Sequence, residues 1–480
     1  MRSSVGRVGL GVVGSVAVGL GIMSACSDST TSRRSSVALT DRSVTPALIK
    51  NLMGGVQAFT LLSSDDVLPE SPDFIFGGST DGAGLLRNQT GNGYTLVVNN
   101  EDNFAVSRIS FDSTFKPVKG EYIVTADHVK SRLCSGTMVT PEEHGFGPVF
   151  LTAGESGVES LNYTLNPFGT ANSAVGRPAL GHWTSENAVP LPKTAYPGKT
   201  VIVIGDDDSG PHGGQVALYV ADAVGDLDGG RLYVLARTND NIRERDMVVG
   251  QTYPVEFRQV PNQTLKTGAQ INTEATALKS IQFGRVEDID YRKDNAGRNV
   301  YIAITGQDNT GINADDSRSK YGRIYHLTLD PTDPTKGTIQ VVLDGDDRNG
   351  VAKTFQNPDN IVVTKNFVYI QEDPNGYGDE THDSYLYQYN IGTKTLKTVF
   401  ELDHRRNDPK YNVGGASTFG SWENSGMIDI SDVVGKPGTF LVGIQAHTWR
   451  GPRYKGADGS VLRANEDQAS QLIILSGLER

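Results

Sequence analysis

Two stretches of the chain repeat one pattern of short apolar runs separated by polar and glycine-bearing turns. In the first stretch the runs lie at 286–289, 300–302, 324–327 and 341–344, and in the second at 358–361, 368–370, 386–389 and 399–403. Their length and their β-branched and aromatic content indicate strands. Tandem units of four short strands are typical of β-propeller blades. The pattern therefore predicts an all-β fold and, within that class, a β-propeller.

Composition extends this interpretation to the rest of the chain. The sequence has 55 glycines among 480 residues, and 37% of its residues are hydrophobic, which suits short strands joined by many tight turns. After the first 25 residues no sustained i, i+3, i+4, i+7 apolar pattern indicates a long amphipathic helix. Residues 74–480 hold six units of the length of the two repeats, so we expect a six-bladed propeller with decorated loops.

The N-terminus has the pattern of an export signal. A weakly basic start precedes an apolar run over residues 8–22, which is short for a membrane span and typical of a signal-peptide core. The run ends in Met23-Ser24-Ala25-Cys26, which is similar to a bacterial lipobox. We expect a lipoprotein signal peptide over 1–25 and lipidation of Cys26. An ordinary secretory signal with an incidental cysteine is the alternative.

The residues after Cys26 predict a tether and a destination. Residues 26–73 are rich in Ser, Thr and Asp, which indicates a flexible tether before a propeller domain at 74–480. Ser27 stands where an inner-membrane retention signal would place Asp. We therefore expect an exported lipoprotein of the outer membrane, on its periplasmic or cell-surface side. We also expect a monomer that touches the membrane only through its lipid.

The chain is acidic. Its formal charge is −12, and loss of Arg2 and Arg7 with the signal peptide changes −12 to −14. Such a charge does not suit nucleic acid, and the sequence has no basic patch with interleaved aromatics. Bound cations would neutralise part of the charge, since clustered carboxylates repel one another until a metal sits among them. A merely soluble acidic surface explains the same total, so the positions of the acids decide.

Acidic and amide residues recur where the predicted strands begin or end. Glu287-Asp288 and Asp359-Asn360 occupy equivalent places in the two repeats. Other acids at strand ends are Glu155, Glu186, Asp206, Asp207, Asp208, Glu372, Asp373 and Glu423. Because the first strand of every blade lines the channel, equivalent strand ends converge, and calcium takes six to eight oxygen ligands. We predict a shared metal site at the channel mouth, with Asp207 and Asp208 as solvated turn residues.

Cys134 is left unpaired if Cys26 carries lipid. It lies in the polar segment 131–136, and exported proteins occupy compartments that oxidise free thiols. Two interpretations of Cys134 stay open: a small buried hydrophobe, or a ligand of a transition metal.

Familiar hydrolase motifs are missing from the sequence. There is no Gly-x-Ser-x-Gly elbow and no His-Glu-x-x-His. None of the eight histidines forms a ligand-spaced pair, which argues against a zinc hydrolase. Asp226-Leu227-Asp228-Gly229 is similar to a haloacid-dehalogenase motif, but a predicted strand follows it at once, which favours a hairpin turn.

From about residue 124 to residue 447 the order of these motifs resembles that of the PhoX-type alkaline phosphatases and their smaller relatives. Members of that family are exported bacterial phosphomonoesterases built as β-propellers. Their channel holds ferric and calcium ions, with one cysteine among the iron ligands. The resemblance implies a metal-dependent hydrolase of small phosphate monoesters that serves phosphate scavenging, with calcium and more than one ferric iron as cofactors.

Individual motifs carry the resemblance. Cys134 is similar to the iron-binding cysteine, Arg285-Val286-Glu287 to an Arg-x-Glu element, and Asn357-Pro358-Asp359-Asn360 to a Pro-Asp-Asn element. Glu372-Asp373 and Glu423-Asn424-Ser425-Gly426 resemble two later elements.

The sequence departs from the family pattern at three positions. Gly154 replaces the first glutamate of the pair that ends in Glu155, Ser185 replaces the histidine before Glu186, and Asp206 stands where the family has a glutamate. These departures bear on the metal composition.

The resemblance also implies roles. The iron-side ligands would be Cys134, Glu155 and Asp206, the calcium-side ligands Glu287, Asp359, Glu372 and Glu423, and the further metal ligands Glu186 and Asp373. Arg285 would hold the phosphate bidentately, and Asn360 would donate to a phosphate oxygen.

Two other functions stay open on the same scaffold. Calcium-dependent lactonases and esterases also use propeller channels with acidic and asparagine ligands, but that interpretation leaves Cys134 unexplained. A non-catalytic calcium-binding surface lipoprotein would need the carboxylates but not Arg285.

Overall fold

The computed structural model describes residues 37–415 and 417–480, which belong to one compact unit. The predicted signal peptide over 1–25 and the lipidated Cys26 lie outside the described residues. Strands dominate the described part, and its helices are short. They are α1 (Ala126–Val129), α2 (Pro141–His144), α3 (Gly268–Ala277) and α4 (Ser431–Val434).

The strands form antiparallel meanders that follow one another along the chain. The first meander contains β3 (Thr80–Arg87), β4 (Tyr94–Asn100), β5 (Ala105–Phe111) and β6 (Pro117–Val124), and the second contains β7 (Leu133–Val139), β8 (Val149–Gly154), β9 (Asn162–Leu165) and β10 (Val175–Gly176). The third contains β11 (Ser185–Pro190), β12 (Thr200–Asp206), β13 (Val216–Ala221) and β14 (Arg231–Arg237). The fourth contains β16 (Val286–Tyr291), β17 (Asn299–Ile304), β18 (Arg323–Leu329) and β19 (Lys336–Asp344). The fifth contains β20 (Pro358–Val363), β21 (Phe367–Glu372), β22 (Tyr385–Asn390) and β23 (Thr395–Leu402). The sixth contains β24 (Glu423–Asp429), β25 (Thr439–Arg450) and β26 (Gln468–Ser476). The strand positions predicted from the two sequence repeats are confirmed by β16–β19 and β20–β23.

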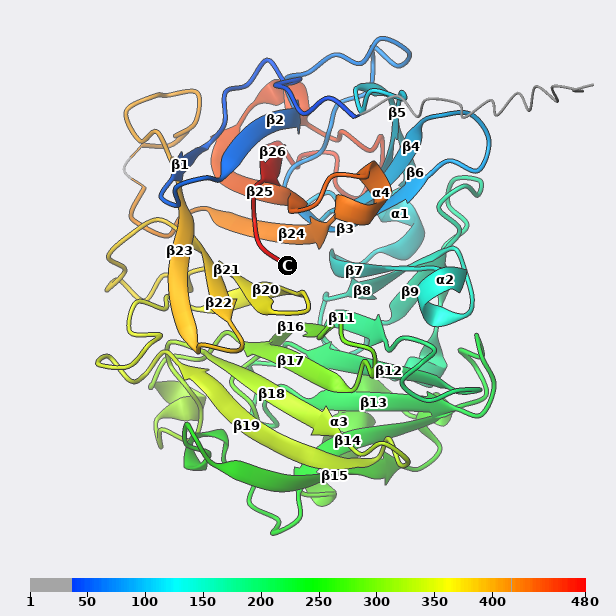
Figure 1. The fold of residues 1–480 in the computed structure, drawn as a ribbon, viewed down its shortest axis with the longest axis vertical. Coiled ribbons are helices and arrows are strands. Elements are labelled where there is room, and N and C mark those ends of the chain that lie inside the picture. Colours follow the sequence, from blue (N-terminus) through cyan, green and yellow to red (C-terminus); the bar gives the residue numbers. More distant parts are fainter. Residues whose placement is uncertain (1–36, 416) are drawn as a thin grey trace, which may run out of the picture. The chain divides into compact units, whose positions relative to one another are not determined.

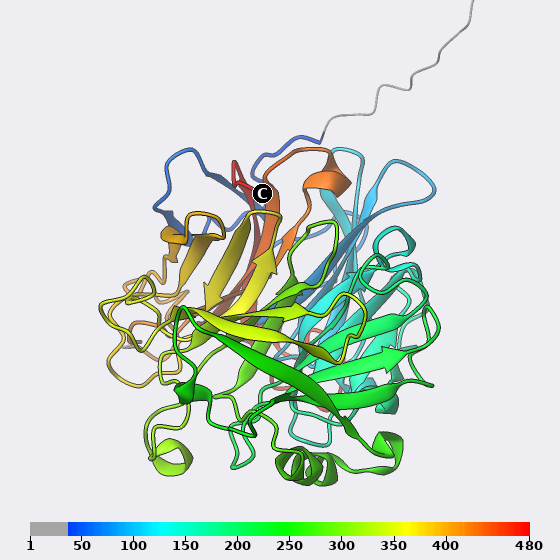
Figure 2. The ribbon, with the colours of Figure 1, turned by 60° about the horizontal axis from the view of Figure 1, so that its bottom comes forward.

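The first strands of the meanders line a common centre (Figure 1). In chain order β3, β7, β11, β16, β20 and β24 each contact the next, and β24 contacts β3, so these inner strands close a ring. A tilted view shows the sheets following one another around the same centre (Figure 2). This radial arrangement is that of a β-propeller.

Two meanders share one sheet. β15 (Thr252–Val260) extends the third meander and pairs antiparallel with β19, with Val255 opposite Gly337. The result is a nine-stranded sheet beside four smaller ones. Because β15 merges two meanders, the six-blade count expected from the sequence stays a prediction.

Residues before position 74 contribute strands, contrary to the tether expected over 26–73. β1 (Ile49–Asn51) pairs with β23, and β2 (Gln57–Ser63) pairs with β26. The physical reason is apolar content, since Leu61 and Leu62 of β2 are buried against the last meander and its neighbour. The tether therefore ends earlier than the Ser- and Thr-rich composition suggested.

Apolar side chains fill the space between adjacent sheets. Val203 and Leu218 of the third meander pack with Ile302 and Tyr325 of the fourth, and all four are inaccessible to solvent. Each aliphatic side chain buried in this way contributes about 1.5–3 kcal/mol. Such packing holds the inner strands in fixed positions around the channel.

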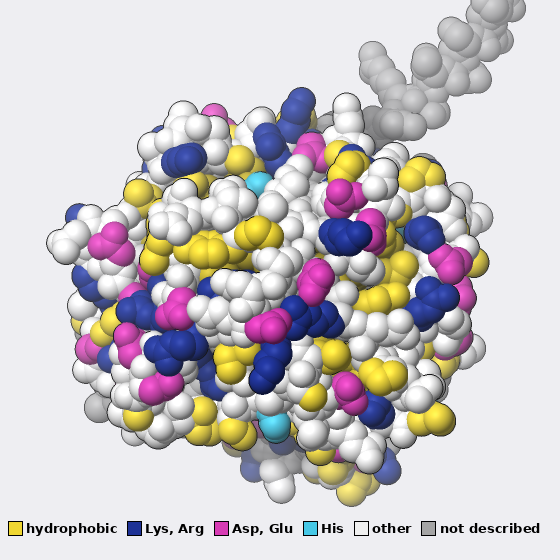
Figure 3. Space-filling model, turned by 90° about the horizontal axis from the view of Figure 1, so that it is seen from below, with side chains coloured by type: hydrophobic (Ala, Val, Ile, Leu, Met, Phe, Trp, Pro, Cys, Tyr) yellow, Lys and Arg dark blue, Asp and Glu magenta, His cyan; other side chains and the backbone are white. Residues whose placement is uncertain are grey.

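The outer surface is of mixed character. On the face that Figure 3 shows, basic and acidic side chains are interspersed with apolar ones. Within residues 37–415 and 417–480, the helices are all too short or too polar to cross a membrane.

Candidate metal centre

Each inner strand carries a β-bulge close to its start. In β16, for example, Val286 pairs with Ile304 and Ile289 pairs with Ile302, so Glu287 and Asp288 together oppose one residue. Equivalent shifts of register occur in β3, β7, β11, β20 and β24. A bulge bends the strand and re-aims a side chain. Here the repeated bulges turn side chains toward the centre of the ring.

The bulged positions hold metal-ligating residue types in five of these strands. They are Asp81 on β3, Cys134 on β7, Glu186 on β11, Glu287 on β16 and Asp359 on β20. In β24 the bulge contains Gly426 and Met427, and the acid of that strand is Glu423 at its start.

A second set of acids leaves the ends of the second strands. Glu101, Glu155, Asp207 and Asp373 directly follow β4, β8, β12 and β21. The antiparallel pairing places each of these ends beside the start of an inner strand. Both sets of acids therefore reach the same mouth of the channel.

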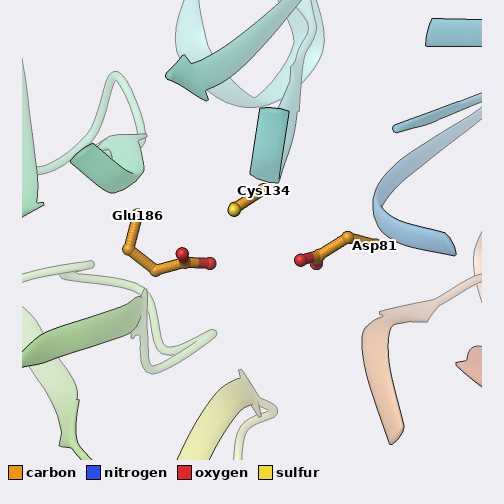
Figure 4. Close-up of side chains that lie close together, drawn as sticks. All are labelled: Asp81, Cys134 and Glu186. Atoms are coloured by element: carbon orange, nitrogen blue, oxygen red, sulfur yellow. The ribbon is translucent and has the colours of Figure 1, made fainter. Parts of the chain in front are cut away.

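Ligand atoms from the two sets lie within 4.8 Å of one another in four groups: Glu101, Cys134 and Glu155; Asp81, Cys134 and Glu186; Glu186, Glu287 and Asp359; and Asp359, Asp373 and Glu423. Figure 4 shows Asp81, Cys134 and Glu186 pointing toward one another from three strands. Because Cys134, Glu186 and Asp359 each belong to two groups, the four groups form one continuous cluster. Such sharing suits several ions held side by side.

The charge of this cluster is not compensated by the protein alone. Burial raises the pKa of Asp81, of Glu186 and of Glu287 well above the usual range, and neighbouring carboxylates raise it further. Burial, with the charges of Asp207 and Glu101, raises the pKa of Glu155 to about 8. Bound cations would remove this repulsion, so the carboxylates fit metal ions.

Unsatisfied acceptors support the same conclusion. Among the described residues, Asp81 Oδ1, Asp359 Oδ1 and Asn360 Oδ1 are buried side-chain oxygens that accept no hydrogen bond. Buried acceptors without partners are uncommon in proteins. A metal ion is a partner that such oxygens take readily.

The donor types divide the cluster into two halves. The two groups that contain Cys134 offer a sulfur and carboxylates, a set that suits a transition metal. Cys134 Sγ donates to Glu155 Oε2 at 2.9 Å. The other two groups offer carboxylates alone, which suits calcium.

Arg285 lies at the edge of the cluster, directly before β16. Its Nε and Nη2 donate to Asp207 Oδ1 and Oδ2 at 2.7 and 3.0 Å, and Nη2 lies 3.0 Å from Glu287 Oε1. Its Nη1 donates to Asn375 Oδ1 at 2.6 Å. The side chain is 23% exposed, so a ligand in the channel mouth can reach it.

Asn360 occupies the bulge of β20 beside Asp359. Its Nδ2 donates to Ser135 Oγ at 2.8 Å, across the channel on β7. One Nδ2 hydrogen is left after this bond, since a side-chain amide has two. Asn360 therefore lies among the ligand groups with a donor to spare.

Two sequence-predicted ligands lie outside the four groups. Asp206 Oδ1 accepts from the Thr184 amide at 3.0 Å. Glu372 accepts from the Gln356 and Tyr385 amides and from Tyr387 Oη, at 2.7, 2.8 and 3.0 Å. Both side chains are fully buried, and Asp206 Oδ2 accepts no hydrogen bond from any described residue. In each case the next residue, Asp207 or Asp373, contacts the cluster.

Other members of the site were not predicted from the sequence. Asp207, expected as a solvated turn residue, is buried and paired with Arg285. Asp81 and Glu101 come from the first meander, where no repeat was recognised. Arg132, directly before β7, lies 3.2 Å from Glu101 and 3.5 Å from Glu155. The signal that could have found them is register, because Thr80-Asp81 and Asn100-Glu101 match the strand starts and ends of later meanders.

The chain is similar to known alkaline phosphatases in sequence and in fold. A family model described as alkaline phosphatase PhoX matches residues 163–414, more than half of the chain. The solved structure of Pseudomonas fluorescens PhoX in complex with vanadate, a transition-state analogue, is similar with a TM-score of 0.61 and 15% sequence identity. That similarity covers 92% of this chain and 99% of the other, and it shows the shared fold.

Two further solved structures have lower TM-scores. An α-L-arabinofuranosidase from Fusarium graminearum has a TM-score of 0.35 and 9% identity, covering 87% of this chain and 97% of the other. Regucalcin from Agrobacterium tumefaciens, a calcium-binding protein, has a TM-score of 0.35 and 10% identity, covering 84% and 91%. No curated protein sequence matched the chain.

Proposed function

This chain belongs to the PhoX alkaline phosphatase family, and on that premise we propose that it hydrolyses phosphate monoesters at the channel cluster with calcium and iron as cofactors. The chain is thus a metal-dependent phosphatase. The observation that carries the finer proposal is the continuity of the four ligand groups around the channel mouth, with Arg285 beside them.

The ligand groups divide between the two metals by their chemistry. Iron would be held by the groups that share Cys134, with Asp81, Glu101, Glu155 and Glu186 as the carboxylates. Calcium would be held by Glu186, Glu287, Asp359, Asp373 and Glu423. Bound ions of this kind neutralise charge on phosphoryl oxygens and lower the pKa of water.

The chain's own residues bind and orient the ester. Arg285 has a guanidinium that recognises phosphate with paired N–H groups, which a lysine does not reproduce. Asn360 has an unused amide hydrogen for a phosphate oxygen. Asn360 belongs to β20 and Arg285 directly precedes β16. Sheet packing fixes both strands, so the two side chains meet the ester without prior rearrangement.

A chelation experiment tests the proposal. A chain without residues 1–26 should hydrolyse 4-nitrophenyl phosphate, lose this activity to a chelator and regain it with added calcium, because the carboxylates repel one another without cations. Elemental analysis of the untreated protein should find iron in stoichiometric amount. Absence of hydrolysis in folded, metal-loaded protein would exclude the phosphatase.

A matched pair of variants distinguishes the loss of a carboxylate in the cluster from the loss of any acidic charge. Glu287→Gln removes a charge from the cluster and should abolish most of the activity. Glu256→Gln removes one from a partly buried position on β15, outside the ligand groups, whose side chain is 41% accessible, and it should leave turnover at the wild-type level. Equal effects of the two substitutions on turnover would contradict the assignment of Glu287 as a metal ligand.

We also propose that the protein is exported, anchored through lipid on Cys26 in the outer membrane, and used to obtain phosphate from esters outside the cytoplasm. The lipobox-like Met23-Ser24-Ala25-Cys26 supports the anchor. Mass spectrometry of the membrane fraction should find acylated Cys26 at the N-terminus. An unmodified soluble protein that begins elsewhere would refute the anchor.

A further inference from the structure

Arg285 uses part of its hydrogen-bonding capacity inside the protein. A guanidinium has five N–H donors. Asp207 takes one from Nε and one from Nη2, and Asn375 takes one from Nη1. One N–H is then left on Nη1, and the remaining N–H of Nη2 lies beside Glu287, whose Oε1 is 3.0 Å from that nitrogen. When a bound cation takes Glu287 as its ligand, these two N–H groups would form the pair that a phosphate accepts in a bidentate contact.

The two partners of Arg285 fix different parts of the guanidinium. The Asp207 carboxylate accepts hydrogen bonds from Nε and Nη2, and this pair of bonds sets the direction of the side chain. Asn375 binds the remaining nitrogen, Nη1, from the opposite end. Asp207 and Glu287 both contact the Nη2 side of the guanidinium, so without Asn375 the Nη1 side would be free to move. Asn375 removes that freedom and so fixes the plane in which the remaining N–H groups of Nη1 and Nη2 lie.

Asn375 is itself held in one orientation. It lies in the loop 373–384 between β21 and β22. Its Nδ2 is 3.1 Å from Tyr377 Oη and 3.5 Å from the Gly306 carbonyl oxygen. Because the amide nitrogen faces these oxygens, the amide oxygen faces the arginine.

The backbone of the loop is anchored to the neighbouring meander. The Asn375 amide donates to Asn357 Oδ1 at 3.2 Å, and Asn357 Nδ2 donates to the Thr305 and Lys320 carbonyl oxygens at 2.7 and 3.0 Å. Asn357 thereby ties the loop of the fifth meander to the strand end of the fourth. The arginine and its asparagine partner keep their spacing because this tie spans the two meanders.

We propose that Asn375 is a positioning residue that orients Arg285 for bidentate binding of the substrate phosphate. This inference rests on the phosphate-binding role of Arg285 in the proposed function. It adds a residue outside the ligand groups and outside the motifs of the sequence analysis. Loss of the Asn375 oxygen leaves the guanidinium held only by Asp207 and Glu287, and neither of them contacts Nη1.

The test is a double-substitution cycle in the full metal-loaded enzyme. Asn375→Leu keeps the side-chain volume and removes the acceptor. It should lower kcat/KM for 4-nitrophenyl phosphate by about tenfold or more, the usual weight of a hydrogen bond to a charged group. The inhibition constant of inorganic phosphate should rise by a similar factor. In an Arg285→Ala background Asn375→Leu should have no further effect, because no guanidinium is left to orient.

Control variants and measurements separate a loss of positioning from a loss of folding or of metal. Asn309→Leu changes an exposed asparagine of the loop between β17 and β18 and should match the wild type. Metal content and Tm are measured for every variant, and Asn375→Ala replaces Asn375→Leu if the latter fails to fold. An equal loss from Asn375→Leu with and without Arg285 would overturn the positioning role.

Failure of the inference and failure of its premise give different results. If Arg285→Ala lowers kcat/KM while Asn375→Leu behaves like Asn309→Leu, the positioning role is wrong and the phosphate contact of Arg285 stands. If Arg285→Ala itself leaves kcat/KM unchanged, the phosphate-binding role of Arg285 is wrong and the inference fails with it.

Discussion

Arg285 and Asn357 share an unusual backbone conformation at equivalent positions, directly before β16 and β20. Their φ angles are +69° and +68°, in a region that non-glycine residues occupy at a cost of about 1–3 kcal/mol. In both places the chain enters an inner strand whose next residues form a bulge. The conformation sends the side chain sideways, Arg285 toward Asp207 of the third meander and Asn357 toward Thr305 of the fourth.

Arg285→Lys should reduce kcat/KM for 4-nitrophenyl phosphate by about 100-fold, because an ammonium cannot grip Asp207 along one edge and present two parallel N–H groups to phosphate. Lysine has the same difficulty with positive φ as arginine, so the backbone strain is unchanged. The Tm should therefore move by only a few degrees. Steady-state kinetics and thermal melts of the metal-loaded protein measure the two effects. Turnover of Arg285→Lys at the wild-type level would contradict the phosphate-binding role of Arg285.

At the scale of elements, the bulges require close approach of neighbouring inner strands. Gly82 follows Asp81 in the bulge of β3, and a Cβ built on it would lie 2.1 Å from the Gly136 nitrogen and 2.5 Å from the Ser135 carbonyl carbon. Both of those atoms belong to β7, which carries Cys134. Any side chain at position 82 therefore pushes apart two strands that hold one ligand group.

Gly82→Ala should destabilise the fold by about 1–3 kcal/mol, as overpacking does, and it should lower the metal content by separating Asp81 from Cys134. Chemical denaturation and elemental analysis measure these effects. Gly54→Ala is the control, because nothing lies within 4 Å of a Cβ at Gly54 and its φ is ordinary. Equal stability and equal metal content in the two variants would contradict the close approach.

The sequence predicted the elements better than it predicted which acids face the channel. Runs of apolar residues located β16–β23, because most of these strands are buried on both faces and so have continuous apolar stretches. The adjacent pairs Asp206-Asp207 and Glu372-Asp373 were ambiguous, since neighbouring residues of a strand point to opposite faces and a bulge on the partner strand decides between them. Asp81 and Glu101 were missed because the glycine-rich strand Thr80–Arg87 has a weak apolar pattern.

At the scale of the whole molecule, a ring of sheets concentrates negative charge at one point. The acids come from all six meanders, so no single element accumulates the charge. The mutual repulsion appears only when the ring closes. Stability of the metal-free protein is therefore linked to protonation of the cluster.

The chelated protein should lose stability as the pH rises from about 4.5 to about 8. The pKa of Glu155 is raised from 4.5 to about 8 in the fold, so the folded state binds the proton more tightly than the unfolded state does. The contribution is complete below the unfolded pKa and disappears as the pH passes the folded one. Thermal melts across this range measure it. Reloading the protein with both calcium and iron should flatten the trend, because Glu155 belongs to a group assigned to iron. An unchanged slope after reloading would contradict metal binding at this cluster.

The pairing of β2 with β26 joins the beginning of the described chain to its end. Asp81 follows shortly after β2, whereas Glu423 opens the last meander. A polypeptide that stops before β24 lacks Glu423 and leaves β2 without its partner strand. The ligand groups are therefore complete only in a chain that extends through the last meander, and a shorter product would lack part of the cluster however well its first meanders fold.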